Sequence, residues 1–188
     1  VTLVDEGIST RTINRKMSAL KSYYRFLQKI KVNNTNPLSG HKALKVNKKV
    51  EVPLSENEME ALFAAIPFKD NFVGTRDKLI IELLYTTGMR RAELLQLQLA
   101  DIDLANCRLK VLGKRNKERI LPLLPPVVQS LEKYLGYRQN VINTTGEKAV
   151  FLTKNGHKIY ETLVYRLINK YLGMVSPKVK KSPHILRH

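Results

Sequence analysis

The sequence is short of cysteine, of acidic residues and of long apolar runs, and each shortage excludes a class of protein. Cys107 is the only cysteine in 188 residues, so the chain forms no internal disulfide and no cysteine-based metal cluster. Because it lies in a strand-like run, we expect it to be a small core residue. The longest apolar run is too short and too charged at its flanks to span a bilayer, and no signal-peptide pattern is visible. We therefore expect a cytoplasmic protein.

Acidic residues number 16 against 33 lysines and arginines, which leaves a formal net charge of +17. Residues 1–50 carry a net +9 (11 basic, 2 acidic), and residues 51–188 carry a net +8 (22 basic, 14 acidic). An excess of this size in a folded chain indicates a polyanionic partner, and nucleic acid is the commonest one. Charge alone does not separate DNA from RNA. A basic surface that serves only solubility is the weaker alternative.

Residues 9–30 have the pattern of one long amphipathic helix, for which Ser9 is a suitable N-cap. Apolar residues at helical spacing form its stripe: Ile13, Met17, Leu20, Tyr24, Leu27 and Ile30. Basic residues lie largely on other faces: Arg11, Arg15, Lys21, Arg25 and Lys29. Such a helix is either a solvated surface helix or one that lies against DNA. Because one helix cannot bury its own stripe, we interpret residues 1–40 as the last part of a helical domain, followed by a basic linker over residues 41–52.

A second domain is expected over residues 53–188. Ser55 and Glu58 form an S-x-x-E capping box, and Pro125-Pro126 opens a helix that runs to about residue 141. Short alternating runs at 108–112 and 119–123 predict a β-hairpin, whose charged turn carries Lys114, Arg115 and Lys117. A brief strand over 149–152 and a helix over 160–172 follow. The predicted fold class is mixed α+β, mainly helical, with a small antiparallel sheet.

Arg90 follows the most apolar segment of the chain, residues 79–85. Gly88 is suited to end the helix that contains this segment, because a glycine in the left-handed region has no Cβ clash. Arg90 then falls in a turn before a short helix over residues 91–97. Its rigid five-donor fork suits a bidentate grip on a carboxylate or a phosphate. Two interpretations stay open at this point: Arg90 pairs with Glu93 and caps the turn, or it binds a phosphate.

A second group of basic residues lies near residue 185. Pro183 suits the first turn of a helix, in which His184 and Arg187 share one face. Together with Arg90 and Lys114, they could neutralise the growing charge on a phosphodiester and move protons at its oxygens without a metal. Taken singly, each has a simpler explanation, because His-x-x-Arg arises often by chance and a basic hairpin tip is usually solvated.

The order and spacing of three motifs resemble the tyrosine recombinase (phage integrase) family, most closely its Xer-type and transposon-integrase members. The motifs are Thr87-Gly88-Met89-Arg90-x-x-Glu93-Leu94, Gly113-Lys114-Arg115-Asn116-Lys117-Glu118-Arg119 with Pro122-Leu123, and His184-x-Leu186-Arg187-His188. The resemblance covers nearly the whole chain. It implies that residues 1–40 are the C-terminal part of a helical, SAM-like core-binding domain. It also implies that residues 53–188 are a catalytic domain that lacks its C-terminal helices.

The resemblance also implies a role for each site residue. Arg90 and Arg187 would hold the non-bridging oxygens of the scissile phosphate. Lys114 would protonate the leaving 5′ oxygen, and His184 would assist proton transfer. Glu93 would orient the catalytic residues without contacting the phosphate itself. The residues expected to contact DNA are Arg11, Arg15, Lys21, Arg25, Lys48, Lys49, Arg115 and Lys117.

One departure from the family pattern is the nucleophile. The family forms a 3′-phosphotyrosyl intermediate with a tyrosine beyond His-x-x-Arg, and none of the eight tyrosines here follows that motif. We expect this chain to bind duplex DNA without cleaving it, to need no cofactor or metal, and to be monomeric, whereas the intact protein acts as a tetramer on DNA near the bacterial nucleoid. A type IB topoisomerase and a non-catalytic DNA-binding module are the alternatives.

Overall fold

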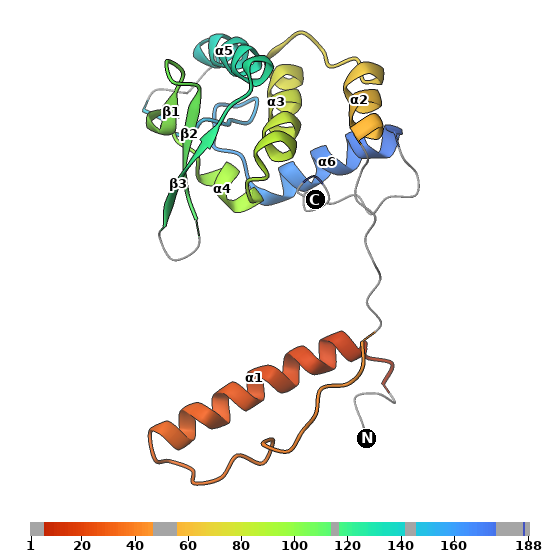
Figure 1. Cartoon of the computed structure of the whole chain (residues 1–188), viewed down its shortest axis with the longest axis vertical. Coiled ribbons are helices and arrows are strands. Elements are labelled where there is room, and N and C mark those ends of the chain that lie inside the picture. The colour runs from red at the N-terminus through yellow and green to blue at the C-terminus, as the bar shows by residue number, and fades with distance from the viewer. Residues whose placement is uncertain (1–5, 47–55, 114–116, 142–145, 176–185, 187–188) are drawn as a thin grey trace. The chain divides into compact units, whose positions relative to one another are not determined.

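The computed structural model describes residues 6–46, 56–113, 117–141, 146–175 and 186, which belong to two compact units, Val1–Val50 and Glu51–His188 (Figure 1). Among these residues, no helix is both long enough and apolar enough to cross a membrane.

The first unit is built on α1, Thr10–Lys29. Ser9 caps the helix as predicted, because its Oγ accepts a hydrogen bond from the backbone N–H of Thr12 at 3.3 Å. The following segment runs back beside α1 (Figure 1). The Asn14 side chain forms two hydrogen bonds of 2.9 Å with the backbone of Leu44, one donated and one accepted. The Lys21 ammonium donates to the carbonyl of His41 at 2.6 Å. These contacts attach the returning segment to the helix.

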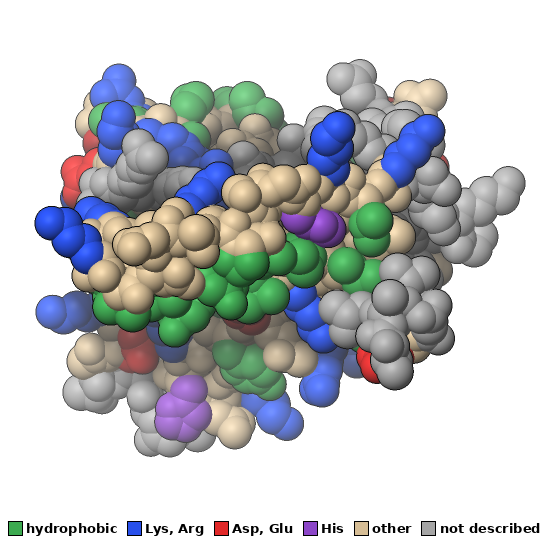
Figure 2. Space-filling model, turned by 90° about the horizontal axis from the view of Figure 1, so that it is seen from below, with side chains coloured by type: hydrophobic (Ala, Val, Ile, Leu, Met, Phe, Trp, Pro, Cys, Tyr) green, Lys and Arg blue, Asp and Glu red, His purple; other side chains and the backbone are tan. Residues whose placement is uncertain are grey.

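The apolar stripe of α1 is only partly covered. Ile13 is buried and Met17, Tyr24 and Leu27 are half-buried, whereas Leu20 and Ile30 are 46% and 47% exposed. In a view from below, hydrophobic side chains gather in one band with lysines and arginines near it (Figure 2). The described residues of this unit therefore leave its helix stripe partly uncovered, as expected for one amphipathic helix.

The second unit is organised around α3, Phe72–Thr87. Five apolar residues of this helix are fully buried: Leu79, Ile80, Ile81, Leu83 and Leu84. Each contributes ~1.5–3 kcal/mol relative to an exposed side chain. The helices around it are α2 (Glu56–Ala65), α4 (Arg91–Gln96), α5 (Pro125–Gln139) and α6 (Glu161–Val175). In Figure 1, α5 lies beside α3, and α6 runs along the ends of α2 and α3. The core of the unit is therefore mainly helical.

A three-stranded antiparallel sheet in the order β1-β2-β3 projects from one end of this core (Figure 1). The strands are β1 (Ile102–Asp103), β2 (Arg108–Leu112) and β3 (Glu118–Pro122). The hairpin predicted from the alternating runs is thus present, with Val111 opposite Arg119. Leu109 and Val111 are buried and point to the core, while their neighbours along the strand are exposed.

The segment around residue 150 differs from its prediction. The expected strand over 149–152 is reduced to two isolated bridges, Gln98 with Ala149 and Leu152 with Lys158. Side chains of α5 bind its backbone instead. Tyr134 Oη donates to the Val150 carbonyl at 3.0 Å, and Arg138 donates to the carbonyls of Val150 and Ala149 at 3.1 and 2.8 Å. Because these side chains satisfy buried backbone groups, the segment does not need a continuous ladder.

The prediction for Cys107 was wrong. The residue is exposed, and its φ of 53° places it in the left-handed region just before β2 begins. Its N–H donates to the Leu104 carbonyl at 3.2 Å, which closes a turn between β1 and β2. The alternation that indicates a strand begins one residue later, so Cys107 belongs to the turn and not to the core.

Candidate active site

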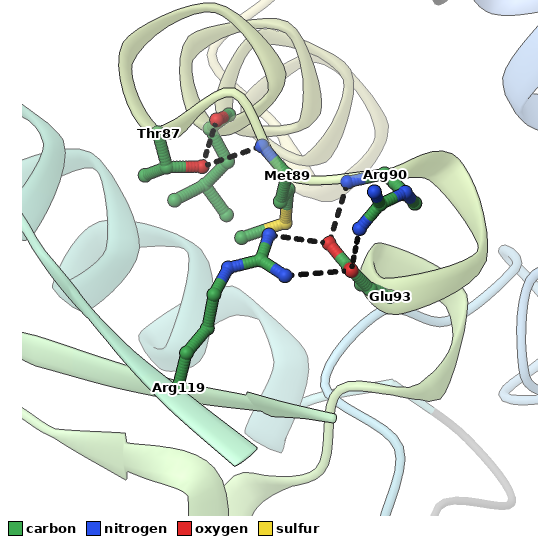
Figure 3. A network of polar contacts seen from close by, with 6 residues as sticks. Thr87, Met89, Arg90, Glu93 and Arg119 are labelled. Atoms are coloured by element: carbon green, nitrogen blue, oxygen red, sulfur yellow. Dashed lines mark hydrogen bonds and ion pairs between the residues drawn. The ribbon is translucent and has the colours of Figure 1, made fainter. Parts of the chain in front are cut away.

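The turn between α3 and α4 is fixed on both sides of Arg90. Gly88 ends α3 in the left-handed region with a φ of 59°, as predicted. Met89 is fully buried, and its N–H donates to Thr87 Oγ1 at 3.3 Å, while Thr87 Oγ1 donates to the Leu83 carbonyl at 2.6 Å (Figure 3). A buried side chain directly before Arg90 and a helix directly after it hold the backbone of Arg90 in place.

Arg90 contacts Glu93 through both its backbone and its side chain (Figure 3). The Arg90 N–H donates to Glu93 Oε2 at 2.7 Å, and Arg90 Nη1 donates to Glu93 Oε1 at 3.0 Å. The Glu93 side chain is 4% exposed, whereas that of Arg90 is 48% exposed. The structure therefore contains the Arg90–Glu93 pair that the first interpretation expects. It does not exclude phosphate binding, because within the described part of the chain the Arg90 guanidinium makes this one hydrogen bond.

Arg119 is a residue that the sequence reasoning missed. It reaches Glu93 from β3, with Nη1 donating to Oε1 at 2.9 Å and Nη2 donating to Oε2 at 2.8 Å (Figure 3). A signal was available in the sequence. In β3 the inward positions are Arg119 and Leu121, while Ile120 is 63% exposed. An arginine on the inward face of a strand requires an acidic or carbonyl partner, and this one has a carboxylate.

The two arginines determine the charge state of the Glu93 carboxylate. Burial raises the pKa of this group, but the hydrogen bonds from Arg119 and Arg90 outweigh burial and lower the pKa of Glu93 below its ordinary value. The carboxylate therefore remains ionised at neutral pH. Two guanidinium groups around one carboxylate leave an excess of one positive charge, and the more exposed of the two side chains is that of Arg90.

Several predicted site residues lie outside the described residues: Lys114, Arg115, His184, Arg187, Lys48 and Lys49. Ser55, half of the predicted capping box, also lies outside them. Leu186, the leucine of the last motif, is described and is 2% exposed within the hydrophobic core of the second unit. Of the five residues assigned to the catalytic site, the structure brings Arg90 and Glu93 together. The catalytic roles of all five remain predictions.

The described basic residues predicted to contact DNA differ in their surroundings. Arg11, Arg15 and Arg25 are exposed on α1, and Lys117 is exposed next to the hairpin turn. The Lys117 carbonyl accepts a hydrogen bond from the Gly113 N–H at 2.8 Å, which closes the hairpin. Lys21 is only half-exposed, and its ammonium is bonded to the His41 carbonyl. The three arginines are therefore more available to a ligand than Lys21.

Family models match both units of the chain. The model of the phage integrase family matches residues 52–188, and the model of the phage integrase N-terminal SAM-like domain matches residues 1–31. The chain is similar to tyrosine recombinase XerC of Chlorobaculum parvum, with 39% identity over 206 residues, covering 99% of this chain and 61% of that protein. Tyrosine recombinase XerD of Staphylococcus haemolyticus is 33% identical over 187 residues, covering 99% and 63%. The chain thus spans about three fifths of the length of these curated relatives.

Solved structures support the fold class. XerH site-specific recombinase bound to palindromic difH substrate has a TM-score of 0.77 at 23% identity, over 97% of this chain and 56% of that one. The Tn1549 transposon integrase in complex with circular intermediate DNA has a TM-score of 0.71 at 23% identity, over 99% and 66%. At such identities the likeness shows the fold, and the predicted mainly helical α+β class with a small antiparallel sheet is confirmed. Because the family model matches residues 52–188 and the recombinase relatives cover almost the whole chain, this chain belongs to the phage integrase family of tyrosine recombinases.

Proposed function

We propose that the protein is a site-specific DNA recombinase that breaks and rejoins strands through a 3′-phosphotyrosyl intermediate. The observation that carries this proposal is the geometry of Arg90, a half-exposed arginine whose backbone and one guanidinium nitrogen are fixed to a buried carboxylate. The names of the XerC and XerD relatives support the same conclusion. An arginine held this way is preorganised to bind a phosphate.

In the proposed cleavage step, the phenol oxygen of a tyrosine attacks phosphorus, and the bond from phosphorus to the 5′ oxygen breaks. The 3′ phosphate stays on the tyrosine, and the 5′ oxygen leaves with a proton from Lys114. Arg90 and Arg187 would bind the non-bridging oxygens, where negative charge grows in the transition state. His184 would assist proton transfer at the attacking oxygen. Glu93 would act through Arg90, because its carboxylate is buried and already bonded.

The proposed partner is duplex DNA, contacted from both units. Residues 1–50 carry a net charge of +9 (11 basic, 2 acidic), and Arg11, Arg15 and Arg25 are exposed on α1. Lysines and arginines that neutralise phosphates release counterions, so DNA affinity should fall steeply as salt rises. We further propose that the intact protein assembles as a tetramer on DNA and acts at the nucleoid of a bacterial cell.

The 188-residue chain by itself is proposed to bind DNA without cleaving it. None of its eight tyrosines follows the His184-x-Leu186-Arg187 motif. Two of them are poor nucleophiles where they lie. Burial raises the pKa of Tyr134 to about 12, and burial together with the nearby carboxylate of Asp77 raises the pKa of Tyr171 to about 12. A raised phenol pKa disfavours the phenolate that attacks phosphorus.

A nicked suicide substrate tests the function. Duplex sites are first selected from a randomised pool by binding, and are then nicked so that a cleaved strand diffuses away and traps the covalent intermediate. The full-length protein is expected to form an adduct at the 3′ phosphate, and the 188-residue chain is expected to bind the same duplex without forming one. An adduct on the 188-residue chain would overturn the assignment of the nucleophile. Failure of the full-length protein to react with any selected site would overturn the recombinase function itself.

A further inference from the structure

The carboxylate of Glu93 joins two segments that are 26 residues apart in the sequence. Each of its oxygens accepts two hydrogen bonds, one from Arg90 and one from Arg119. Oε1 accepts from Arg90 Nη1 at 3.0 Å and from Arg119 Nη1 at 2.9 Å, and Oε2 accepts from the Arg90 N–H at 2.7 Å and from Arg119 Nη2 at 2.8 Å. The turn before α4 and the strand β3 are thus bonded to the same buried group (Figure 3).

The hairpin packs onto this ion pair at Gly113, the residue directly before Lys114. A Cβ at Gly113 would lie 3.2 Å from Arg119 Nη1, 3.2 Å from the Lys117 carbonyl oxygen and 3.7 Å from Glu93 Oε1. Its N–H donates to that Lys117 carbonyl at 2.8 Å. The Gly113 backbone is therefore held between the Arg119–Glu93 pair and the carbonyl of Lys117, the residue directly before β3.

We propose that Arg119 is a positioning residue, which acts through Glu93 to hold the hairpin segment leading to Lys114 against the turn that presents Arg90. The inference rests on the proposed recombinase function and deepens it, because it names the residue that couples the two halves of the site. Arg119 itself does not need to touch DNA for this role.

Arg119 also leaves most of the Arg90 guanidinium available. It occupies one acceptor direction on each oxygen of Glu93, so Arg90 uses a single guanidinium nitrogen on the carboxylate. Without Arg119, a buried carboxylate would have vacant acceptor sites, and the Arg90 fork could turn inward to make the bidentate pair. A lysine in place of Arg119 keeps the charge but cannot bond both oxygens with a planar fork.

Cleavage kinetics of the full-length protein test this coupling, with Arg119→Gln, Arg119→Lys and the control Arg108→Gln. Arg108 is an exposed arginine of β2 on the same hairpin, and its substitution removes the same charge. Each variant is assayed in single turnover on an ordinary duplex and on one whose scissile 5′ oxygen is replaced by sulfur. A thiolate leaves without a proton, so the sulfur substrate bypasses the step assigned to Lys114.

Arg119→Gln is expected to slow cleavage of the ordinary duplex about 100-fold, the loss typical of a misplaced catalytic group, with DNA affinity nearly unchanged. The sulfur substrate should recover about tenfold or more of that loss, because a general acid contributes at least that much. Arg119→Lys should recover only part of the rate, and Arg108→Gln should match the wild type. A rate for Arg119→Gln equal to the control, or an equal loss on both substrates, would overturn the coupling. A wild-type protein that cleaves neither substrate would instead overturn the proposed function.

Amide hydrogen exchange in the 188-residue chain tests the same contact without any chemistry on DNA. The Arg90 N–H is bonded to Glu93 and the Gly113 N–H to Lys117, so both report whether the two segments stay in place. In Arg119→Gln both amides are expected to exchange about tenfold faster or more, and in Arg108→Gln they should not change. Unchanged exchange at both amides in Arg119→Gln would overturn the positioning role even if the recombinase function holds.

Discussion

One arginine–carboxylate pair lies in the first half of α3 and another lies at the start of α4, and the two pairs present their arginines in opposite ways. In the first half of α3, Arg76 is 6% exposed and bonds Asp77 Oδ1 through Nε and Nη2 at 3.0 and 2.7 Å. Its Nη1 donates to the Leu152 carbonyl at 3.0 Å, and Tyr171 Oη donates to Asp77 Oδ2 at 3.2 Å. At the start of α4, the carboxylate of Glu93 is buried but the side chain of Arg90 is 48% exposed.

The difference between Arg76 and Arg90 shows what makes an arginine available to a ligand. Arg76 gives all three of its nitrogens to groups of its own fold, and its guanidinium lies 5.9 Å from the centre of the Phe72 ring. Arg90 is held through its backbone N–H and one guanidinium nitrogen, and the rest of its guanidinium stays free of Glu93 because Arg119 bonds the same carboxylate. A buried acid with two arginine partners can therefore fix one of them while leaving it open to an incoming anion.

Substitution of the buried arginine should have the largest effect on stability. Arg76→Ala leaves the carboxylate of Asp77 buried without its ion partner, so the free energy of unfolding of the 188-residue chain should fall by about 3–5 kcal/mol. Arg90→Ala should lower it by about 1 kcal/mol or less, because Arg119 still satisfies Glu93. Urea denaturation measures both. Equal losses in the two variants would break the comparison.

Arg90, whose substitution should change stability little, should have a large effect on catalysis. In the full-length protein, Arg90→Ala is expected to slow strand cleavage about 100- to 1,000-fold, as the loss of one donor to a developing oxyanion does. Arg187→Ala should do the same. Duplex affinity should change only a few-fold (about threefold), because most of it comes from other phosphate contacts. Adduct formation on a nicked duplex and filter binding measure the two quantities, and near-normal cleavage by either variant would contradict the assigned role.

Two glutamates on either side of Gly88 should respond to acid in opposite directions. Burial raises the pKa of Glu82, so its contribution to stability is present below the unfolded-state pKa and is lost as pH rises through the folded-state pKa. The pKa of Glu93 is lowered from 4.5, so its contribution is present above that value and is lost as pH falls through the folded-state pKa. Glu82→Gln should therefore stabilise the chain at neutral pH and have little effect in acid.

Glu93→Gln is the matched variant and should destabilise the chain at neutral pH, with a smaller effect in acid. Denaturant unfolding at several pH values measures both variants. The same pH trend in both would show that the two carboxyl groups do not have opposite pKa shifts.

The smallest expected effect concerns the cations of α1, where the same contrast between a free and an engaged side chain recurs. Arg25 is exposed, whereas the ammonium of Lys21 donates to the His41 carbonyl. Arg25→Gln should weaken duplex binding a few-fold (about threefold) and reduce the slope of log affinity against log salt by about 1. Lys21→Gln should change this slope less. Titrations at several salt concentrations measure it, and a larger slope change for Lys21→Gln would reverse the ranking.

Local patterns in the sequence were enough to predict the features that depend on neighbouring residues. The end of α3 at Gly88, the cap at Ser9 and the hairpin around residue 113 each follow from the conformational limits or the alternation of a few adjacent residues. The Arg90–Glu93 contact was one of two interpretations left open, and it too is local, because residues three apart at a helix start lie close together.

Features that depend on distant residues were not predicted. Arg119 finds its partner 26 positions away, and the segment around Val150 is bonded by Tyr134 and Arg138 of another helix. The alternation of β3 indicates that Arg119 faces inward, but no pattern within either segment indicates which distant residue it contacts. Cys107 shows a related limit, because one residue decides whether a side chain belongs to a strand or to the turn before it.

Leu186 makes deletion experiments at the C-terminal end of the second unit ambiguous. The side chain is 2% exposed in the core, and removal of a buried leucine typically costs about 2–5 kcal/mol. Any shortened chain that stops before it loses packing and the neighbouring Arg187 in one step. An inactive truncation would then look like a chemical defect when it is partly a folding defect. Point substitutions that keep the leucine are needed to tell the two apart.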